Sequence, residues 1–219
     1  PRQPEPKFFT VDELFARGLD YYAETWFQSL EEGRLLGEKS TSYLENRNAA
    51  ERIYRSLPAV RLIFMLRNPV DRAYSNYLWS HRNGFETETF ARGLALEEER
   101  ARALPPQLRY ARPFDYFSRG IYVAQLARFL RFFPREQILL LRTEDVAAQP
   151  DRVAAEVQEF LGVTIEPDLA GGLSRINVSV PEGAPPMPAA IRAALQARYR
   201  EPNRELRALI GPDFPLWTE

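Results

Sequence analysis

The sequence predicts an α/β fold in which a parallel sheet is covered by helices on both faces. Two apolar runs, residues 62–66 and 138–141, are too short for helices and suit strands buried on both sides. Each run follows a stretch with helical spacing and leads through turn residues into another helical stretch. Because strands that alternate with helices form parallel sheets, this order indicates the α/β class.

The residues before the first of these strands predict three helices and one short strand. Thr10 and Asp12 can cap a helix that ends at Phe15, and residues 18–27 carry an apolar stripe with helical spacing. Residues 35–44 have the pattern of a short strand that leads into a Ser/Thr-rich loop. The third helix is amphipathic and ends at a proline; it is expected over residues 48–57.

Five further helices are expected after the first strand. They are predicted over residues 69–83, 89–104, 121–133, 152–161 and 188–210, the last broken in two at Pro202. The charged run 97–100 is expected to form a solvated helix face. The aromatic stretch 113–117 fits a lid or an acceptor-binding wall, and it fits simple packing equally well.

The most informative stretch is the strand-turn-helix junction at residues 61–75. Asn68 can cap the helix, and Pro69 suits its first position, where a missing N–H costs nothing. Arg67 ends the strand, and Ser75 lies two turns into the helix. This edge of an α/β sheet binds ligands, and free N–H groups at a helix start favour an anion. The alternative is that Arg67 only caps or forms a surface ion pair, as in any such unit.

Composition narrows the class of protein. The 219 residues, 45% of them hydrophobic, can bury one good core, so one domain is expected. The net charge of −1 gives no sign of a nucleic-acid binder, and no apolar run approaches the ~18 residues that a membrane span needs. The absence of Cys and a single His exclude disulfides, thiolate metal sites and most zinc sites. A cytoplasmic location is expected, and the predominance of Arg over Lys is typical of G+C-rich bacteria.

One near-match to a nucleotide-binding loop fails. Residues 33–40 contain two glycines followed by Lys39 and Ser40, but three residues separate the glycines where the nucleotide loop has four. Glu38 also stands before Lys39, where backbone N–H groups should surround a phosphate. This segment therefore gives little support to a kinase, and Glu38 with Lys39 fits a simple exposed pair.

Several ordered motifs together resemble one family. Residues 67–75, Arg-Asn-Pro-Val-Asp-Arg-Ala-Tyr-Ser, resemble the 3′-phosphate-binding motif of sulfotransferases that use 3′-phosphoadenosine 5′-phosphosulfate (PAPS). The resemblance is closest to the heparan sulfate N- and 3-O-sulfotransferases and their bacterial relatives. It extends over residues 5–9, 18–22, 38–40 with 43–44, 118–122 with 128–134, and 199–203.

The resemblance implies a P-loop-like, three-layer α/β/α fold and transfer of a sulfuryl group from PAPS to a hydroxyl or amine. It implies that Arg67 and Ser75 hold the 3′-phosphate, that Glu5 is the general base, and that Lys39 lies near the transferred group. Further cofactor contacts are expected from Tyr122, Arg175, Asn177 and Ser179. Other branches of the family use a histidine as base, so His81 stays open as the alternative to Glu5.

The sequence departs from the family at the 5′-phosphosulfate loop. A Lys-x-Gly-Thr-Thr segment is expected upstream of Glu5, and no such segment is present. We therefore expect residues 1–219 to be a single sulfotransferase domain that begins after this loop. A kinase of the same fold and a non-catalytic relative remain the alternatives. A small-molecule or carbohydrate acceptor is expected, and neither its identity nor the oligomeric state can be predicted.

Overall fold

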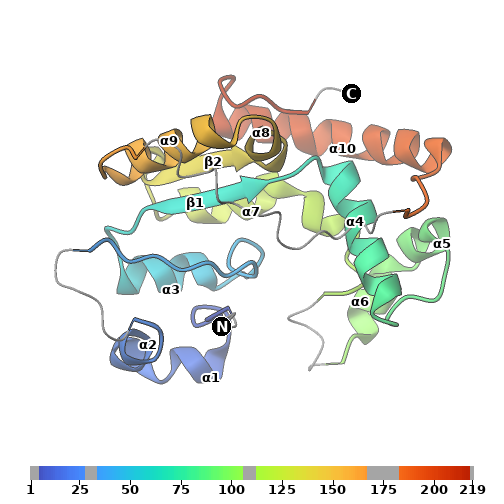
Figure 1. Cartoon of the computed structure of the whole chain (residues 1–219). Helices are drawn as coiled ribbons and strands as arrows, with labels where there is room; N and C mark the ends of the chain where they lie inside the picture. The colour runs from blue at the N-terminus through green and yellow to red at the C-terminus, as the bar shows by residue number, and fades with distance from the viewer. Residues whose placement is uncertain (1–4, 28–33, 106–111, 167–182, 218–219) are drawn as a thin grey trace. The chain divides into compact units, whose positions relative to one another are not determined.

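The computed structural model describes residues 5–27, 34–105, 112–166 and 183–217. The chain divides into two compact units. The first unit consists of Pro1–Leu62 and Gln125–Ile138, and the second consists of Ile63–Ala124 and Leu139–Glu219. Their elements are labelled in Figure 1.

The first unit is helical and has an aromatic core. Its helices are α1 (Asp12–Phe15), α2 (Gly18–Trp26), α3 (Ala49–Ser56) and most of α7 (Tyr122–Leu130). The Phe8 ring stacks on Tyr22 at 4.6 Å, and Phe9 meets Tyr43 edge-on at 5.6 Å. Residues 5–9 and the start of the Ser/Thr-rich loop are therefore held on the same aromatic cluster as α2.

The prediction of a short strand at residues 35–44 was wrong. The described part of this segment has no strand, and Leu35 and Leu36 are 59% and 48% exposed. Side chains take the place of a strand partner here, because Ser40 Oγ accepts from Lys7 N at 3.0 Å and Thr10 Oγ1 bonds Ser42 Oγ at 3.0 Å. The segment is thereby fixed by side-chain hydrogen bonds to residues 7–10.

The second unit contains the sheet. Strands β1 (Leu62–Leu66) and β2 (Ile138–Arg142) pair in a two-stranded parallel sheet, and each leads into a helix. Figure 1 shows α9 (Pro150–Leu161) and α10 (Ala189–Ile210) lying along one side of these strands. Helix α8 (Thr143–Ala148), which follows β2, was not predicted.

Strand β1 is buried on one face only within the described part of the chain. Phe64 and Leu66 are 8% and 1% exposed, whereas Ile63 and Met65 are 38% and 55% exposed. Successive side chains of a strand point to opposite faces, so the apolar run at 62–66 supplies both a core face and an exposed face. The expectation that both faces are buried was wrong for this strand.

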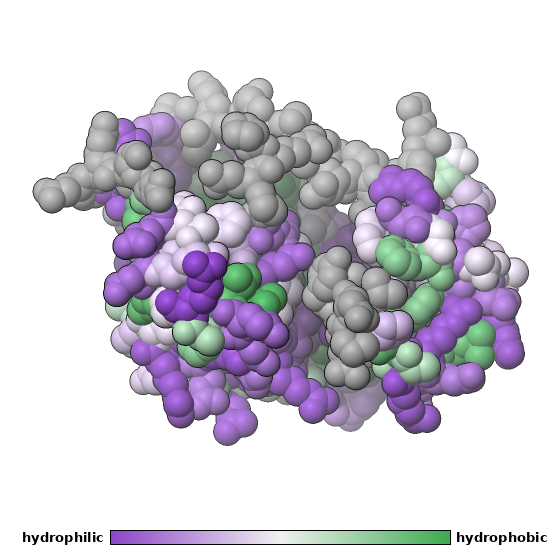
Figure 2. Space-filling model, turned by 90° about the horizontal axis from the view of Figure 1, so that it is seen from below, coloured by the Kyte–Doolittle hydropathy of each residue, from purple (hydrophilic) through white to green (hydrophobic). Residues whose placement is uncertain are grey.

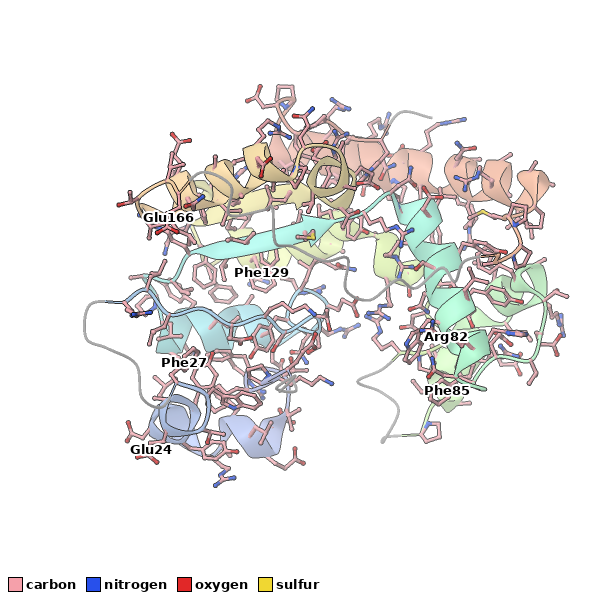
Figure 3. All side chains as sticks on the ribbon, viewed as in Figure 1. Glu24, Phe27, Arg82, Phe85, Phe129 and Glu166 are labelled. Carbon is pink, nitrogen blue, oxygen red and sulfur yellow. The ribbon has the colours of Figure 1, made fainter. Side chains whose placement is uncertain are left out.

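Helix α4 (Pro69–Arg82) begins as the sequence predicts. Asn68 Oδ1 accepts a hydrogen bond from Val70 N at 3.0 Å, Pro69 is the first helical residue, and Asn83 follows the last. Figure 3 shows Phe85 just beyond this end of the helix, near Arg82. The Phe85 ring stacks on Trp79 at 5.6 Å, which packs the chain back against α4 as it leaves the helix.

Two predicted helices differ from the observed ones because of tertiary packing. The helix expected over 89–104 is broken at Leu96 into α5 (Phe90–Ala95) and α6 (Glu97–Ala103), and Glu97 is buried, not solvated. Helix α10 continues through Pro202, where a break was expected. Buried residues on both sides of Pro202 keep α10 continuous; they are Leu195, Tyr199, Leu206 and Ile210.

The long helix expected over 121–133 is shorter in the structure. A 3₁₀ turn, η2 (Ser118–Gly120), precedes α7, which begins at Tyr122 and ends at Leu130. In the stretch 113–117, Tyr116 is fully buried in the core of the second unit with Val70, Ala73 and Phe90. Packing therefore accounts for Tyr116.

The view in Figure 2 is mostly hydrophilic, with apolar residues in small separate patches. Of the helices in the described ranges, none is long and apolar enough to cross a membrane. The same residues contain no cluster of His, Asp or Glu able to hold a metal ion.

Candidate functional site

Arg67 and Ser75 lie at the C-terminal end of β1 and on the helix that follows it. Arg67 directly follows the strand and is partly buried, and Ser75 is 5% exposed on α4. Among the described residues the Arg67 guanidinium makes no hydrogen bond or ion pair. Arg67 is thus not a surface ion pair in this structure, and its fork of donors is available to an anion.

Fewer backbone N–H groups at the start of α4 are free to bind an anion than the sequence predicted. The Asn68 N–H donates to Glu144 Oε1 at 2.8 Å, the Val70 N–H is used by the Asn68 side chain, and Pro69 has none. A carboxylate, Glu144, therefore occupies the end of the helix that favours anions. The expectation that free N–H groups at the start of this helix attract an anion is corrected for Asn68 and Val70, whose N–H groups are already bonded within the chain.

Tyr122 acts on the Arg67 backbone. Its hydroxyl donates to the Arg67 carbonyl oxygen at 2.9 Å, and the residue is 5% exposed. The Tyr122 ring lies 5.9 Å from the ring of Trp217, near the C-terminus. The structure therefore shows that Tyr122 fixes the backbone at Arg67; its predicted contact with the cofactor stays a prediction.

Glu5 lies in the first unit, at the centre of a small polar cluster. Lys39 Nζ donates to Glu5 Oε1 at 2.5 Å, and Thr41 donates to Oε2 from its hydroxyl at 2.8 Å and from its N–H at 3.2 Å. Burial opposes the charge on Glu5, but these hydrogen bonds and the Lys39 charge together hold its pKa below the usual value. Glu5 is therefore an ionised and oriented carboxylate.

Glu38 and Lys39 are not partners of each other. Glu38 accepts hydrogen bonds from the Tyr22 hydroxyl at 3.3 Å and from Ser40 Oγ at 3.0 Å, whereas Lys39 pairs with Glu5. The Lys7 backbone has a φ of 52°, in the left-handed region that non-glycine residues seldom adopt. This bend connects Glu5 to the buried Phe8, so strain is stored beside the polar cluster.

Of the remaining predicted site residues, His81 lies away from Ser75 on α4, and the other three lie outside the described residues. His81 is exposed in the last turn of α4, where its ring lies 6.0 Å from that of Tyr77. It lies six positions after Ser75, which is not a whole number of helical turns, so the two lie on different faces of the helix. Arg175, Asn177 and Ser179 lie outside the described residues.

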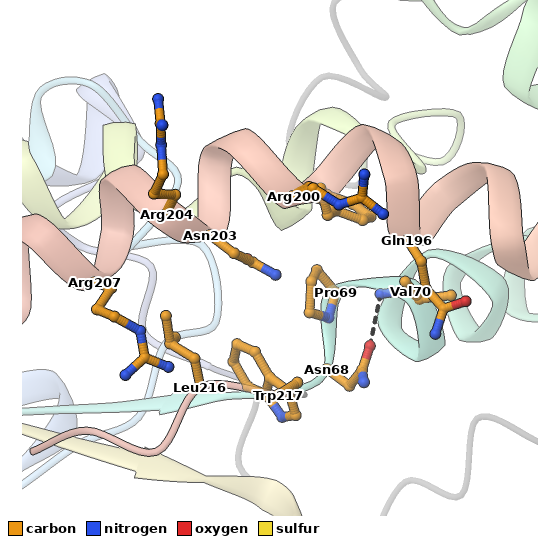
Figure 4. Close-up of a pocket in the computed structure, with 11 residues that line it drawn as sticks. Asn68, Pro69, Val70, Gln196, Arg200, Asn203, Arg204, Arg207, Leu216 and Trp217 are labelled. Carbon is orange, nitrogen blue, oxygen red and sulfur yellow. Dashed lines mark hydrogen bonds between the residues drawn. The ribbon is translucent and has the colours of Figure 1, made fainter. Parts of the chain in front are cut away.

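A pocket of about 400 Å³ opens at the start of α4 in the second unit. Figure 4 shows the Asn203 amide pointing into it from α10, with Trp217 and Asn68 on the opposite wall. Arg200, Arg204 and Arg207 also line it, and Arg67 and Ser75 do not. Arg204 is ion-paired with Glu201, so the positive charge at this pocket is partly neutralised.

A match to a protein-family model identifies the family of this chain. The model of the sulfotransferase domain matches residues 5–176, which include Glu5, Lys39, Arg67 and Ser75. The chain belongs to the sulfotransferase family. The recognition made from the motifs is thereby confirmed.

The chain resembles sulfotransferases in sequence and in structure. It is 29% identical over 233 residues to human heparan sulfate glucosamine 3-O-sulfotransferase 6, with 96% of this chain and 64% of that protein covered. It is 28% identical over 242 residues to mouse bifunctional heparan sulfate N-deacetylase/N-sulfotransferase 4, with 98% and 27% covered. The chain thus spans less than two thirds of either relative.

A crystal structure of a sulfotransferase from Alicyclobacillus acidocaldarius matches with a TM-score of 0.77 and 31% identity. The match covers 96% of this chain and 84% of that one. The P-loop-like α/β fold class is thereby confirmed.

Sequence reasoning on this sulfotransferase chain missed two residues that contact the predicted ones. Thr41 binds Glu5 through two donors, and Glu144 accepts from the Asn68 N–H. Thr41 could have been found from its position in the Ser/Thr-rich loop, two residues after Lys39. Glu144 is distant from Asn68 in sequence and carries no motif, so only the folded sheet reveals it.

Proposed function

We propose that the chain transfers a sulfuryl group from PAPS to a hydroxyl or amine of a small-molecule or carbohydrate acceptor. The observation that carries the proposal is Arg67, whose guanidinium has no partner in the described part of the chain although it is partly buried at the end of a central strand. A partly buried cation without a partner needs a counter-ion. In a member of the sulfotransferase family, the 3′-phosphate of the donor fits that need.

Arg67 and Ser75 have suitable chemistry for the 3′-phosphate. A guanidinium presents paired N–H donors that match two phosphate oxygens, and the Ser75 hydroxyl can add a third bond. The Tyr122 hydroxyl holds the Arg67 carbonyl, which limits how far the backbone can shift when the side chain binds. The proposal therefore assigns binding to Arg67 and Ser75, and orientation to Tyr122.

Glu5 suits the role of general base. The acceptor proton would pass to the Glu5 carboxylate as the acceptor atom bonds to sulfur, while the bond from sulfur to the 5′-phosphate breaks and 3′-phosphoadenosine 5′-phosphate (PAP) leaves. Glu5 is ionised and oriented by Thr41, whereas His81 is exposed on the last turn of α4. These contacts favour Glu5 over His81.

Lys39 is proposed to stabilise the charge that develops during transfer. Its side chain is 67% exposed, and its ammonium group pairs with Glu5. An exposed lysine pays little to exchange one anionic partner for another, so Lys39 can turn from Glu5 to the donor. That exchange would also release the carboxylate to act as a base.

The test is a thermal-unfolding titration with PAP, which needs no acceptor. A ligand that binds only the native state stabilises it by about 2.7 kcal/mol at a hundred times its Kd. We expect PAP to raise the unfolding temperature and ATP to raise it much less. Failure of PAP to stabilise the protein would contradict the proposed donor, and stabilisation by ATP alone would favour a kinase.

Arg67→Ala provides the residue-level arm of this test. The variant is expected to lose most of the stabilisation by PAP, because charge-assisted bonds to phosphate contribute about 1.5–3 kcal/mol each. Arg61→Ala is the matched control, since Arg61 is an exposed arginine just before the other end of β1. Equal loss in both variants would show a general charge effect.

A further inference from the structure

Glu97 is a buried acid that neither the motifs nor the proposed reaction uses. It is 7% exposed at the start of α6, next to the exposed Glu98 and Glu99. Its Oε2 accepts from the Phe117 N–H at 2.7 Å, and its Oε1 accepts from the Ser118 N–H at 2.8 Å. The two oxygens of one carboxylate thus bind two consecutive backbone amides.

The segment held in this way, residues 117–122, lies against α4. Gly120 approaches so closely that a Cβ built on it would be 2.9 Å from Pro69 Cβ and 2.5 Å from the Tyr199 hydroxyl. The Tyr199 hydroxyl in turn donates to the Phe117 carbonyl at 2.8 Å. Glu97 and Tyr199 therefore fix the start of the segment from two helices, α6 and α10.

The same segment contacts the chain at Arg67 and next to Ser75, the two proposed phosphate-binding residues. Arg119 Nη1 donates to Asn76 Oδ1 at 2.9 Å, one residue beyond Ser75. Tyr122 donates to the carbonyl of Arg67 at 2.9 Å. The segment thus connects the two positions whose spacing determines whether Arg67 and Ser75 can bind one phosphate group.

We propose that Glu97 is a positioning residue for the 3′-phosphate site, acting through residues 117–122. The inference rests on the proposed function. If the hydrogen bonds from Glu97 to the N–H groups of Phe117 and Ser118 are lost, the segment can shift. Its contacts with Asn76 and Arg67 then no longer hold these two residues in fixed positions. The loss of binding affinity is then expected for the 3′-phosphate, which Arg67 and Ser75 hold, and not for the rest of the nucleotide.

The test compares two ligands that differ only in the 3′-phosphate, PAP and adenosine 5′-phosphate, by calorimetry on purified protein. In Glu97→Gln one of the two amides faces an NH₂ group and loses its acceptor. We expect the Kd for PAP to rise about tenfold, as for a buried amide left without a partner, and the Kd for adenosine 5′-phosphate to stay within about twofold. Glu98→Gln is the matched control, because Glu98 is 86% exposed and pairs with Arg102 on the surface.

The outcomes separate this inference from the proposed function. No PAP binding by the wild-type protein would overturn both proposals. Wild-type binding with an unchanged ratio of the two Kd values in Glu97→Gln, or an equal loss for both ligands, would overturn the role of Glu97 alone. Should Glu97→Gln fail to fold, Glu97→Asp is the second variant, because it retains the charge but is one methylene shorter. The ratio of the Kd values for PAP and adenosine 5′-phosphate is then measured on that variant.

Discussion

At the scale of single residues, the proposed role of Glu5 as the base makes two demands on its carboxylate that oppose each other. Lys39 and Thr41 hold its carboxylate in one orientation, and the same contacts hold its pKa below the usual value. A lower pKa keeps the group ionised, yet it also makes the carboxylate a weaker base. The position of Lys39 therefore sets the balance between order and basicity.

Glu5→Gln should abolish turnover and leave donor binding intact. The amide keeps the shape of the side chain but cannot take a proton, and a general base contributes about 10²–10⁴ in rate. Sulfation rates and PAP affinity are measured on the same preparation, with the exposed Glu24→Gln as control. A parallel loss of PAP affinity would argue that Glu5 binds the donor and is not the base.

Lys39→Met should shift the acid limb of the pH–rate profile to higher pH. Glu5 accepts a proton only when ionised, so activity falls as pH drops through its folded pKa, which is lowered from the usual glutamate value in the wild-type chain. Without the Lys39 charge and hydrogen bond, burial dominates and that pKa rises. The midpoint is the readout, because the variant also lowers the maximum rate. An unmoved midpoint would mean that another group controls this limb.

At the scale of elements, the strongest local signals predicted the strands and most helices. The Asn68 and Pro69 pair predicted the start of α4 because capping depends on neighbouring residues alone. The break at Leu96 and the continuity at Pro202 depend on packing partners that are distant in sequence, such as Phe117 for Glu97. Local propensity carries no information about those partners, so both elements were predicted incorrectly.

Gly120→Ala should destabilise the second unit. A Cβ at this position meets Tyr199 and Pro69 within 3.0 Å, and forced overpacking costs about 1–3 kcal/mol. Chemical denaturation measures the loss in free energy of unfolding. Gly37→Ala is the control, since a Cβ there meets nothing within 4 Å, and it should leave the stability within about 0.5 kcal/mol of wild type. Equal stabilities would show that η2 can move away from α4.

At the scale of the whole molecule, one buried carboxylate links stability to pH. Glu86 is 2% exposed and accepts from Arg100 Nη1 at 2.5 Å, from the Tyr116 hydroxyl at 2.8 Å and from the Glu88 N–H at 2.8 Å. Burial opposes its charge, but these bonds outweigh burial and lower its pKa. The folded state therefore binds this proton less readily than the unfolded state does.

The chain should lose stability as pH falls below about 4.5, because the contribution of Glu86 is complete above its unfolded pKa and disappears below its folded pKa. Glu86→Gln should lower the free energy of unfolding at pH 7 by about 3–5 kcal/mol and flatten its pH dependence below the usual glutamate pKa. Urea titrations at several pH values measure both effects. Glu88→Gln, an exposed neighbour, is the control. A curve that stays steep in Glu86→Gln would place the pH dependence elsewhere.

The sequence named candidate residues for the site but could not predict the contacts that they make. The family resemblance named Glu5 and Lys39, whereas the spacing of the motif at residues 67–75 placed Arg67 at a strand end and Ser75 two turns into a helix. Thr41 bonds Glu5, Glu144 bonds the Asn68 N–H, and Tyr122 bonds the Arg67 carbonyl; these hydrogen bonds span 36, 76 and 55 residues and have no local pattern. Glu97 had been assigned to the solvated face because its neighbours are charged, whereas the fold turns this one carboxylate inward.

The contact between Trp217 and Tyr122 gives the protein an intrinsic optical probe. Trp217 lies 5.9 Å from the ring whose hydroxyl holds Arg67, while Trp26 and Trp79 lie on α2 and α4. Replacing those two by phenylalanine would leave a single emitter beside the proposed phosphate site. Its emission wavelength and quenching by iodide would then report, without any added dye, when an anion arrives at Arg67.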